Sequence, residues 1–246
     1  MTEAPHPQRI GVLGGTFDPV HHGHLAAARS AERALRLHQL WFIPSARPPH
    51  RSDPPHASFP ARLGMLQQAI GESPGWQTCD LESRRAGPSF TFDTLVALQD
   101  QGPDRKALSP SQIFFIIGAD AFAEIESWHR YPDVLEQAHF VVITRPGYEL
   151  ETLRQRLPPL ASRMVDVPQD ADFDTPHIFL VSSLTPNVSS SDIRRRLQVG
   201  EPIEGLVPTA VAAYISQHHL YKRGSTPAAS DGSVGKQLAW PSRRNQ

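Results

Sequence analysis

The feature that most constrains this chain is the alternation of short, wholly apolar runs with longer segments of helical periodicity. Apolar runs at residues 9–13 and 40–43 flank an alanine-rich helical pattern at residues 22–37. A strand, a helix and a second strand over so short a stretch form a βαβ unit. The run Ile-Phe-Phe-Ile-Ile at residues 113–117 is apolar at every position, which is typical of a parallel strand covered on both faces. The pattern therefore predicts an α/β fold, with a doubly wound, mostly parallel sheet and helices on both faces.

Further elements continue this alternation. The sequence predicts strands at residues 76–81, 140–144 and 178–181 and helices at residues 60–70, 91–98, 132–138, 191–197 and 208–219. Ser89 precedes one of these helices and is a candidate N-cap. Because ligands of parallel sheets bind beyond the carboxyl ends of the strands, we expect the functional site among residues 14–24, 118–120 and 182–194.

Composition limits the possible classes of protein. The 24 basic and 25 acidic residues leave a net charge of −1, so the chain lacks the positive excess that nucleic-acid binding requires. The single cysteine, Cys79, excludes an intrachain disulfide and a cysteine-rich zinc site. No apolar run approaches the roughly 20 residues of a membrane helix, and the first residues lack the apolar core of a signal peptide. We expect a cytoplasmic protein with no membrane partner.

The chain divides into a folded part and a tail. Residues 1–223 are expected to form a single domain, whereas residues 224–246 lack periodicity and are expected to be disordered. Within the domain, residues 44–60 contain six prolines and few apolar residues. A loop of this length in a compact domain is usually functional or disordered.

The segment at residues 14–24 reads Gly-Gly-Thr-Phe-Asp-Pro-Val-His-His-Gly-His and joins a predicted strand to a predicted helix. Glycines allow a ligand to approach the backbone closely, and a helix N-terminus favours phosphate. His21 and His24 can point the same way on the first helical turn, which suits the charge that develops in phosphoryl transfer. Two other interpretations stay open: surface histidines beside a simple turn, or a metal site, for which the segment supplies only Asp18 as a third ligand.

A second segment opens a late helix. Residues 188–194 read Val-Ser-Ser-Ser-Asp-Ile-Arg, in which a serine run caps the helix. The hydroxyls of Ser190 and Ser191 can hold phosphate oxygens, and Arg194 can bind them with two parallel hydrogen bonds. A helix cap with a solvated basic face is the alternative interpretation.

Together the two segments carry a family resemblance. The first resembles the Gly-His loop of the nucleotidylyltransferase superfamily, and its Gly-Gly-Thr-Phe-Asp-Pro-x-His form is similar to that of the bacterial nicotinate-nucleotide adenylyltransferases. The second resembles the superfamily motif Ile-Ser-Ser-Thr-x-Ile-Arg, with Val188 in place of Ile and Ser191 in place of Thr. The resemblance implies a Rossmann-like nucleotidylyltransferase fold and transfer of AMP from ATP to nicotinate mononucleotide. That step of NAD biosynthesis yields nicotinate adenine dinucleotide and pyrophosphate by in-line attack, without a covalent enzyme intermediate.

The resemblance also assigns roles to particular residues. It implies that His21, His24 and Arg194 are catalytic. The residues that it implies for ATP binding are Gly14, Gly15, Thr16, Phe17, Gly118, Asp120, Ser190 and Ser191. Those that it implies for nicotinate-nucleotide binding are Arg51 in the proline-rich loop, Thr91 in a Ser-Phe-Thr segment where the family has Ser-Tyr-Thr, and Trp128, whose indole would stack on the pyridine ring.

Cofactor and partners follow from the same resemblance. No acidic pair offers a dedicated metal site, and Mg²⁺ often binds through substrate phosphates, so we expect Mg²⁺ to arrive with ATP. ATP and nicotinate mononucleotide are the expected partners, with no nucleic acid, and a homo-oligomer is possible. Two rival functions are close to this one: adenylyl transfer to phosphopantetheine or to nicotinamide mononucleotide, and cytidylyl transfer. A third is that of an aminoacyl-tRNA synthetase, for which the chain is too short and too neutral. The last is nucleotide binding without catalysis.

Overall fold

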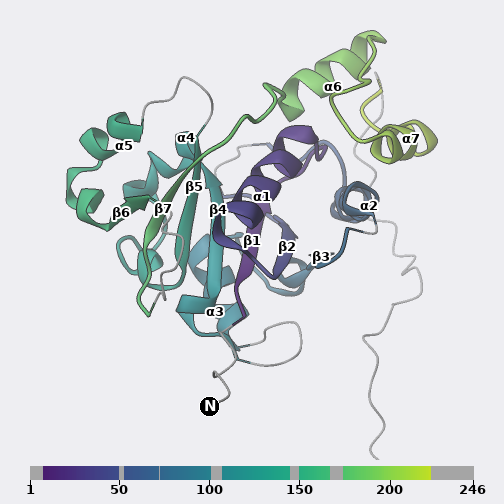
Figure 1. Cartoon of the computed structure of the whole chain (residues 1–246). Helices are drawn as coiled ribbons and strands as arrows, with labels where there is room; N and C mark the ends of the chain where they lie inside the picture. The colour runs from purple at the N-terminus through teal and green to yellow at the C-terminus, as the bar shows by residue number, and fades with distance from the viewer. Residues whose placement is uncertain are drawn as a thin grey trace, which may run out of the picture.

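Parallel strands form one sheet at the centre of the molecule (Figure 1). The computed structural model describes residues 8–49, 53–71, 73–100, 107–144, 150–166 and 174–222. Within them the sheet order is β3-β2-β1-β4-β5-β7-β6, and every neighbouring pair is parallel. The strands are β1 (Ile10–Gly15), β2 (Gln39–Pro44), β3 (Trp76–Thr78), β4 (Ile113–Gly118), β5 (His139–Thr144), β6 (Met164–Asp166) and β7 (Ile178–Ser182). Arg51 and the predicted tail at residues 224–246 lie outside the described residues.

Helices cover both faces of the sheet. One face is covered by α1 (His22–Leu35) and α2 (Phe59–Ile70); α7 (Thr209–Gln217) packs against α2, and buried residues of α6 (Ser190–Val199) and α7 join the same apolar cluster. The other packs against α3 (Thr91–Asp100), α4 (Ala119–Phe122) and α5 (Leu150–Arg156). Short 3₁₀ helices complete the second layer or join elements: η1 (Leu81–Arg84), η2 (Pro110–Gln112), η3 (Ile125–Ser127), η4 (Asp133–Glu136) and η5 (Pro158–Arg163).

Alternation along the strands divides the core in two. In β4, Phe114 and Ile116 belong to the cluster under α1, whereas Phe115 and Ile117 belong to the cluster under α3. Successive side chains of a strand point to opposite faces, so a strand that is apolar at every position needs a helical layer on each side. The predicted doubly wound α/β fold is confirmed.

The chain reverses its direction of winding between β1 and β4. From β1 it proceeds to β2 and β3 on one side of the sheet, and it then returns to β4 beside β1 before adding strands on the other side. Neighbouring connections therefore depart in opposite directions at the β1–β4 boundary. The crevice that results at the carboxyl ends of these strands is the usual ligand site of open α/β sheets.

Several predictions of local structure were wrong. The strand expected at residues 76–81 ends at Thr78, and the helix expected at residues 132–138 is the 3₁₀ helix η4. The three-residue strand β6 and the helix α5 were not predicted. Ser89 does not cap α3; its hydroxyl accepts a hydrogen bond from the Arg47 backbone N–H at 3.0 Å and so ties the loop after β2 to the start of α3.

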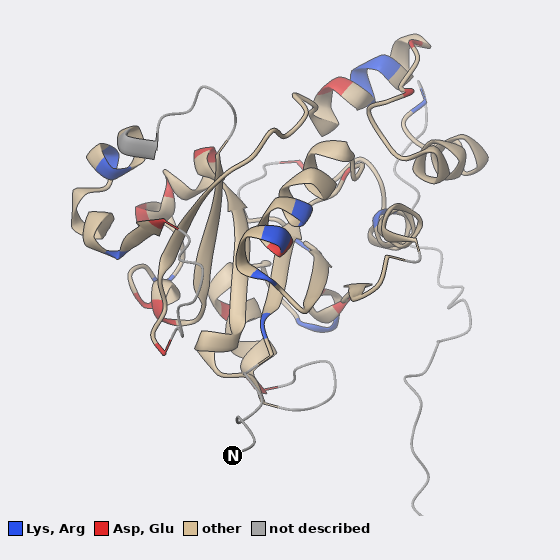
Figure 2. Cartoon of the chain, viewed as in Figure 1, with Lys and Arg blue, Asp and Glu red and all other residues tan. Residues whose placement is uncertain are grey.

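Charged side chains of both signs are interspersed over the visible elements (Figure 2). On α6, Asp192 accepts hydrogen bonds from Arg195 and Arg196, each at 2.8 Å. These two guanidinium groups lower the pKa of the Asp192 carboxyl. Asp192 therefore offsets only part of the positive charge of the arginine run on this helix. None of the helices in the described ranges is long and apolar enough to cross a lipid bilayer.

Candidate active site

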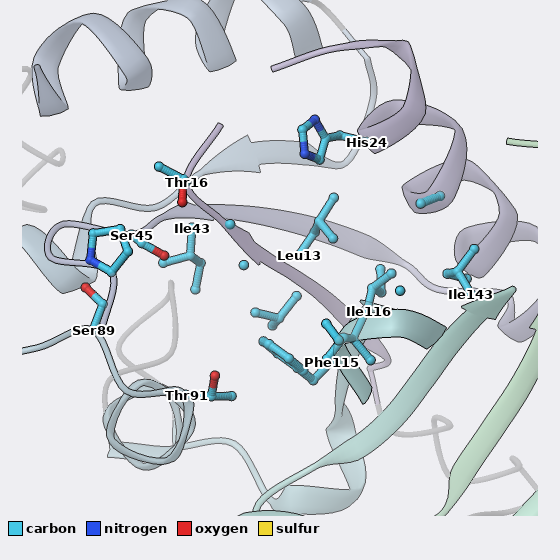
Figure 3. A pocket seen from close by; sticks show the side chains of 18 of the residues that line it. Leu13, Thr16, His24, Ile43, Ser45, Ser89, Thr91, Phe115, Ile116 and Ile143 are labelled. Atoms are coloured by element: carbon cyan, nitrogen blue, oxygen red, sulfur yellow. The ribbon is translucent and has the colours of Figure 1, made fainter. Parts of the chain in front are cut away.

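A cavity of about 600 Å³ opens at the carboxyl ends of β1 and β4. Its floor is apolar and includes Leu13, Ile43, Phe115 and Ile116, while polar side chains stand around it (Figure 3). Thr91 approaches from α3, and His24 approaches from α1 on the opposite side (Figure 3). An apolar cavity of this size with a few convergent polar groups is typical of a small-ligand site.

His21 and His24 lie face to face at one end of the cavity. Their ring centroids are 3.7 Å apart, and the planes differ by 28°. The His24 Nδ1 accepts a hydrogen bond from the His21 backbone N–H at 3.2 Å. A Cβ atom on Gly23 would lie 3.0 Å from the His21 Nδ1, so the glycine between the two histidines leaves room for the His21 ring.

The environment of His24 favours its neutral form. Burial lowers the pKa of His24 well below its ordinary value, and the neighbouring His21 lowers it further. Because Nδ1 accepts a backbone hydrogen bond, the neutral ring carries its proton on Nε2. At neutral pH, His24 is thus a fixed hydrogen-bond donor rather than a cation.

The N-terminus of α6 borders the same end of the cavity. Ser189 caps the helix by accepting a hydrogen bond from the Asp192 backbone N–H at 3.2 Å. Ser190 and Ser191 line the cavity, and the Ser190 hydroxyl donates to the Pro19 carbonyl oxygen at 2.8 Å. This bond joins α6 to the loop that follows β1.

Arg194 is directed inward and does not line the cavity. Arg194 is only 8 % exposed. Its guanidinium donates hydrogen bonds to the Asp18 carbonyl oxygen at 2.6 Å and to the Ser191 hydroxyl at 3.1 Å. The second contact holds a cavity-lining hydroxyl in position. A guanidinium has five N–H donors, so these two bonds leave further donors on Arg194.

Asp18 forms a buried junction that the sequence interpretation missed. Its carboxylate is covered and accepts hydrogen bonds from the backbone N–H groups of His56 and Ala57, at 2.8 and 3.0 Å, and from the Tyr221 hydroxyl at 2.8 Å. Burial and the Asp18 charge raise the pKa of Tyr221. The sequence suggests only a metal-ligating role for Asp18, because its actual partners are distant along the chain.

The opposite end of the cavity is aromatic. Thr91 and Trp128 both line it, and the half-buried Trp128 meets the ring of Phe115 edge-on at 6.4 Å. The rings of Phe90 and His129 stack at 4.2 Å and also line this end. His129 was not predicted; its position directly after Trp128 is the only signal in the sequence.

The structure brings most of the predicted residues to the cavity but not all of them. Those that line it are Gly14, Gly15, Thr16, His21, His24, Thr91, Gly118, Trp128, Ser190 and Ser191. Phe17 lies behind it, where its ring meets His24 edge-on at 5.0 Å. Asp120 is exposed on α4 and does not line the cavity. Arg51 falls outside the described residues.

Metal ligands do not converge in the described parts of the chain, where no three His, Cys, Asp or Glu side chains are grouped to hold an ion. Apart from the single carboxylate of Glu82, the polar side chains around the cavity are mainly hydroxyls and imidazoles. Such groups suit phosphate oxygens better than they suit a bare divalent cation, which prefers carboxylates and water.

Comparisons with known proteins agree with this architecture. The Cytidylyltransferase-like family model matches residues 12–196. A probable nicotinate-nucleotide adenylyltransferase of Pseudomonas syringae is 40% identical over 92% of this chain and 98% of its own length. The one from Geobacillus thermodenitrificans is 36% identical over 96% of this chain and 98% of its own length.

Solved structures show the same fold. The nicotinic acid mononucleotide adenylyltransferase of Plasmodium falciparum, complexed with NaAD, superposes with a TM-score of 0.65 at 20% identity, over 87% of this chain and 97% of that chain. The family model and the relatives span most of the chain, including both histidines and the start of α6. The chain therefore belongs to the nicotinate-nucleotide adenylyltransferase family of cytidylyltransferase-like nucleotidyltransferases.

Proposed function

We propose that this protein transfers AMP from ATP to nicotinate mononucleotide, releasing pyrophosphate and forming nicotinate adenine dinucleotide for NAD biosynthesis. The observation that carries the proposal is one cavity with two chemically different ends. His21, His24 and the α6 serines border one end, and Thr91 and Trp128 border the other. The names of the relatives, probable nicotinate-nucleotide adenylyltransferases, support the same reaction.

The reaction needs positioning rather than a covalent intermediate. The 5′-phosphate of nicotinate mononucleotide is already an anionic nucleophile and attacks the α-phosphorus of ATP in line, while the bond to the pyrophosphate oxygen breaks. The neutral His24 donates from Nε2 to a phosphoryl oxygen on which negative charge accumulates. A donor that is fixed before the reaction stabilises this charge without reorganisation.

The serines and Arg194 hold the leaving pyrophosphate. The Ser191 hydroxyl and the backbone N–H groups of Ser190 and Ser191 at the start of α6 bind the outer phosphates of ATP, while the Ser190 hydroxyl holds the loop at Pro19. Arg194 holds the Ser191 hydroxyl in place through their 3.1 Å hydrogen bond. Arg194 therefore acts on the phosphates through Ser191, because its guanidinium faces inward and does not line the cavity.

A divalent ion, expected to be Mg²⁺, enters with ATP on its phosphates. Mg²⁺ usually retains several waters and binds through phosphates with few protein ligands. Ser191, which lines the cavity, would contact the water shell of such an ion through its hydroxyl. When bound, the ion neutralises charge on the pyrophosphate leaving group.

The decisive experiment measures pyrophosphate release from the purified protein with ATP and Mg²⁺. Nicotinate mononucleotide, nicotinamide mononucleotide and phosphopantetheine are offered in parallel, and CTP replaces ATP in a further arm. We expect release with ATP and the nicotinate compound. Equal release with the amide would remove the selection for a carboxylate, and release only with CTP or phosphopantetheine would overturn the proposal.

Trp128 provides a test of the acceptor end. Replacing it with alanine removes a stacking surface, which typically stabilises a bound base by about 1–3 kcal/mol. We expect Trp128→Ala to raise the KM for nicotinate mononucleotide about tenfold, with less effect on kcat, and Trp128→Phe to restore part of the loss. An unchanged KM would assign Trp128 to packing against Phe115 instead.

A further inference from the structure

We propose that Glu82 accepts a hydrogen bond from a ribose hydroxyl of the pyridine mononucleotide, which makes it a specificity-determining residue of the acceptor site. This inference rests on the proposed function. No motif in the sequence analysis singled out Glu82. It lies in η1, directly after β3, and its side chain forms part of the cavity wall.

The Glu82 carboxylate is buried and only half satisfied. The residue is 7 % exposed, and its Oε1 accepts a hydrogen bond from the Thr94 hydroxyl at 2.8 Å. Its Oε2 is buried and receives no hydrogen bond from any residue that the structure describes. Leaving a buried charged acceptor unpaired is unfavourable, so this oxygen is an acceptor for which a ligand can supply the donor.

The basic side chains next to Glu82 are engaged elsewhere. Arg84 pairs with Asp80 at 2.6 Å, and Arg85 lies 3.8 Å from the Asp93 carboxylate. Within the described ranges, Glu82 forms no ion pair that would explain the burial of its charge. The geometry is therefore that of a binding group rather than of a structural salt bridge.

The position of Glu82 assigns it to the acceptor nucleotide. η1 contacts α3 and β2. It therefore lies in the half of the sheet formed by β1, β2 and β3. Thr94, its hydrogen-bond partner, lies one helical turn after Thr91, and both threonines line the cavity. The phosphate-binding groups, by contrast, come from α1 and α6.

Among the groups of the pyridine mononucleotide, the ribose hydroxyls are the ones that can donate a hydrogen bond to Glu82. A nicotinate carboxylate has no proton to donate at neutral pH and would be repelled by a second carboxylate. The ribose carries two hydroxyl donors, and carboxylates commonly bind ribose hydroxyls in nucleotide-binding α/β folds. A buried acceptor of this kind rejects an analogue that lacks the matching hydroxyl far more strongly than an apolar wall would.

The test compares nicotinate mononucleotide with its 2′-deoxy and 3′-deoxy analogues by titration calorimetry and by kcat/KM. For the wild-type protein we expect at least one deoxy analogue to bind about tenfold more weakly or worse, as for a hydrogen bond to a charged group. In Glu82→Gln, which keeps the side-chain size but loses the charge, this penalty should fall severalfold. In Glu82→Met, which has no polar atom there, it should be less than about twofold.

Controls separate the possible failures. Glu126→Gln changes an exposed glutamate on η3 and should retain the full deoxy penalty, and thermal unfolding checks that each variant is folded. If Glu82→Met does not fold, the comparison of the wild-type protein with Glu82→Gln still shows whether Glu82 binds a ribose hydroxyl. Wild-type protein that turns over both deoxy analogues as well as the parent, or a penalty that Glu82→Gln leaves unchanged, would overturn the role of Glu82 alone. Absence of pyrophosphate release with any pyridine nucleotide would overturn the proposed function itself.

Discussion

Among single residues, the stacked His21–His24 pair shows which properties of a site a sequence motif can predict and which it cannot. Their spacing predicted that both side chains face the same way, and the structure places both on the cavity. The protonation state of His24 could not be predicted, because it depends on burial by residues from other elements. The inward direction of Arg194 was equally hidden, since its partner Asp18 is 176 residues away.

Removing the His24 imidazole tests its role as a donor. We expect His24→Ala to lower kcat by about 10²–10³, the usual loss for one preorganised donor to a developing oxyanion, with the fold intact by circular dichroism. His22→Ala is the matched control, because His22 is on the same helix but does not line the cavity. Comparable turnover in the two variants would remove His24 from the mechanism.

The lowered pKa of His24 also predicts how stability depends on pH. The unfolded chain binds a proton at His24 near the ordinary pKa of 6.5, whereas the folded protein resists protonation there. Below pH 6.5 the unfolded state therefore binds more protons, and the free energy of unfolding falls as the pH falls towards the folded pKa. The His24 contribution is at most about 1.4 kcal/mol per pH unit.

Urea denaturation between pH 7.5 and pH 5 measures this dependence. We expect the free energy of unfolding of the wild-type protein to fall more steeply over that range than that of His24→Ala, because the variant lacks the group. Parallel curves for the two proteins would show that the His24 pKa does not differ between the folded and unfolded states.

At the level of secondary structure, the long apolar strands were predictable and the short edge elements were not. A strand such as β4, which is buried on both faces, is apolar along its length. The edge strand β6 has three residues and only one buried position, which leaves almost no periodic signal. Residues 132–138 looked helical in sequence but form the tighter turn of η4, which follows Pro132.

Packing between α2 and α7 depends on a glycine in the middle of α2. Alanine normally stabilises a helix relative to glycine by up to about 1 kcal/mol. A Cβ at Gly64, however, would overlap the Tyr214 hydroxyl oxygen and lie 2.8 Å from its Cζ. We expect Gly64→Ala to reduce the free energy of unfolding by about 1–3 kcal/mol, as overpacking usually does.

A second substitution identifies the cause of this loss. Tyr214→Phe removes the overlapping hydroxyl. In that background, Gly64→Ala should reduce the free energy of unfolding by less than it does in the wild-type protein, as measured by the same urea denaturation. If Gly64→Ala is as stable as the wild type or more so, α7 adjusts its position freely and the close approach has no energetic importance.

Across the whole molecule, the doubly wound parallel sheet and the two segments that meet at its cavity follow from the sequence, whereas the strand order and the contacts that close the structure around the cavity do not. The Tyr221 hydroxyl donates to the Asp18 carboxylate over a separation of 203 residues. No periodicity or motif indicates such a contact, because it depends on the path of the entire chain. Glu82 was missed for the same reason: its burial arises from the meeting of η1 with α3.

The junction at Asp18 connects the end of the described chain to the loop after β1. Tyr221→Phe removes one hydrogen bond to a buried carboxylate, and we expect it to reduce the free energy of unfolding by about 1.5–3 kcal/mol. Tyr131→Phe is the control, since no hydrogen bond of its hydroxyl is present in the described structure. Equal stability of the two variants would mean that the Asp18 carboxylate is satisfied without Tyr221.

The reversal of winding between β1 and β4 has a consequence for how such proteins diversify. Elements on one side of this boundary, from β2 to α3, supply Glu82, Thr91 and the loop near Ser45, while α1 and α6 supply the groups proposed to bind the triphosphate. Mutations in the β2–α3 half can therefore change the accepted partner, provided that His56, Ala57 and Arg62, which hold the loop after β1, are retained. Exchange of residues 45–98 together with the segment that carries Trp128 and His129 should transfer acceptor preference between relatives, while the adenylyl-transfer chemistry is inherited from the rest of the chain.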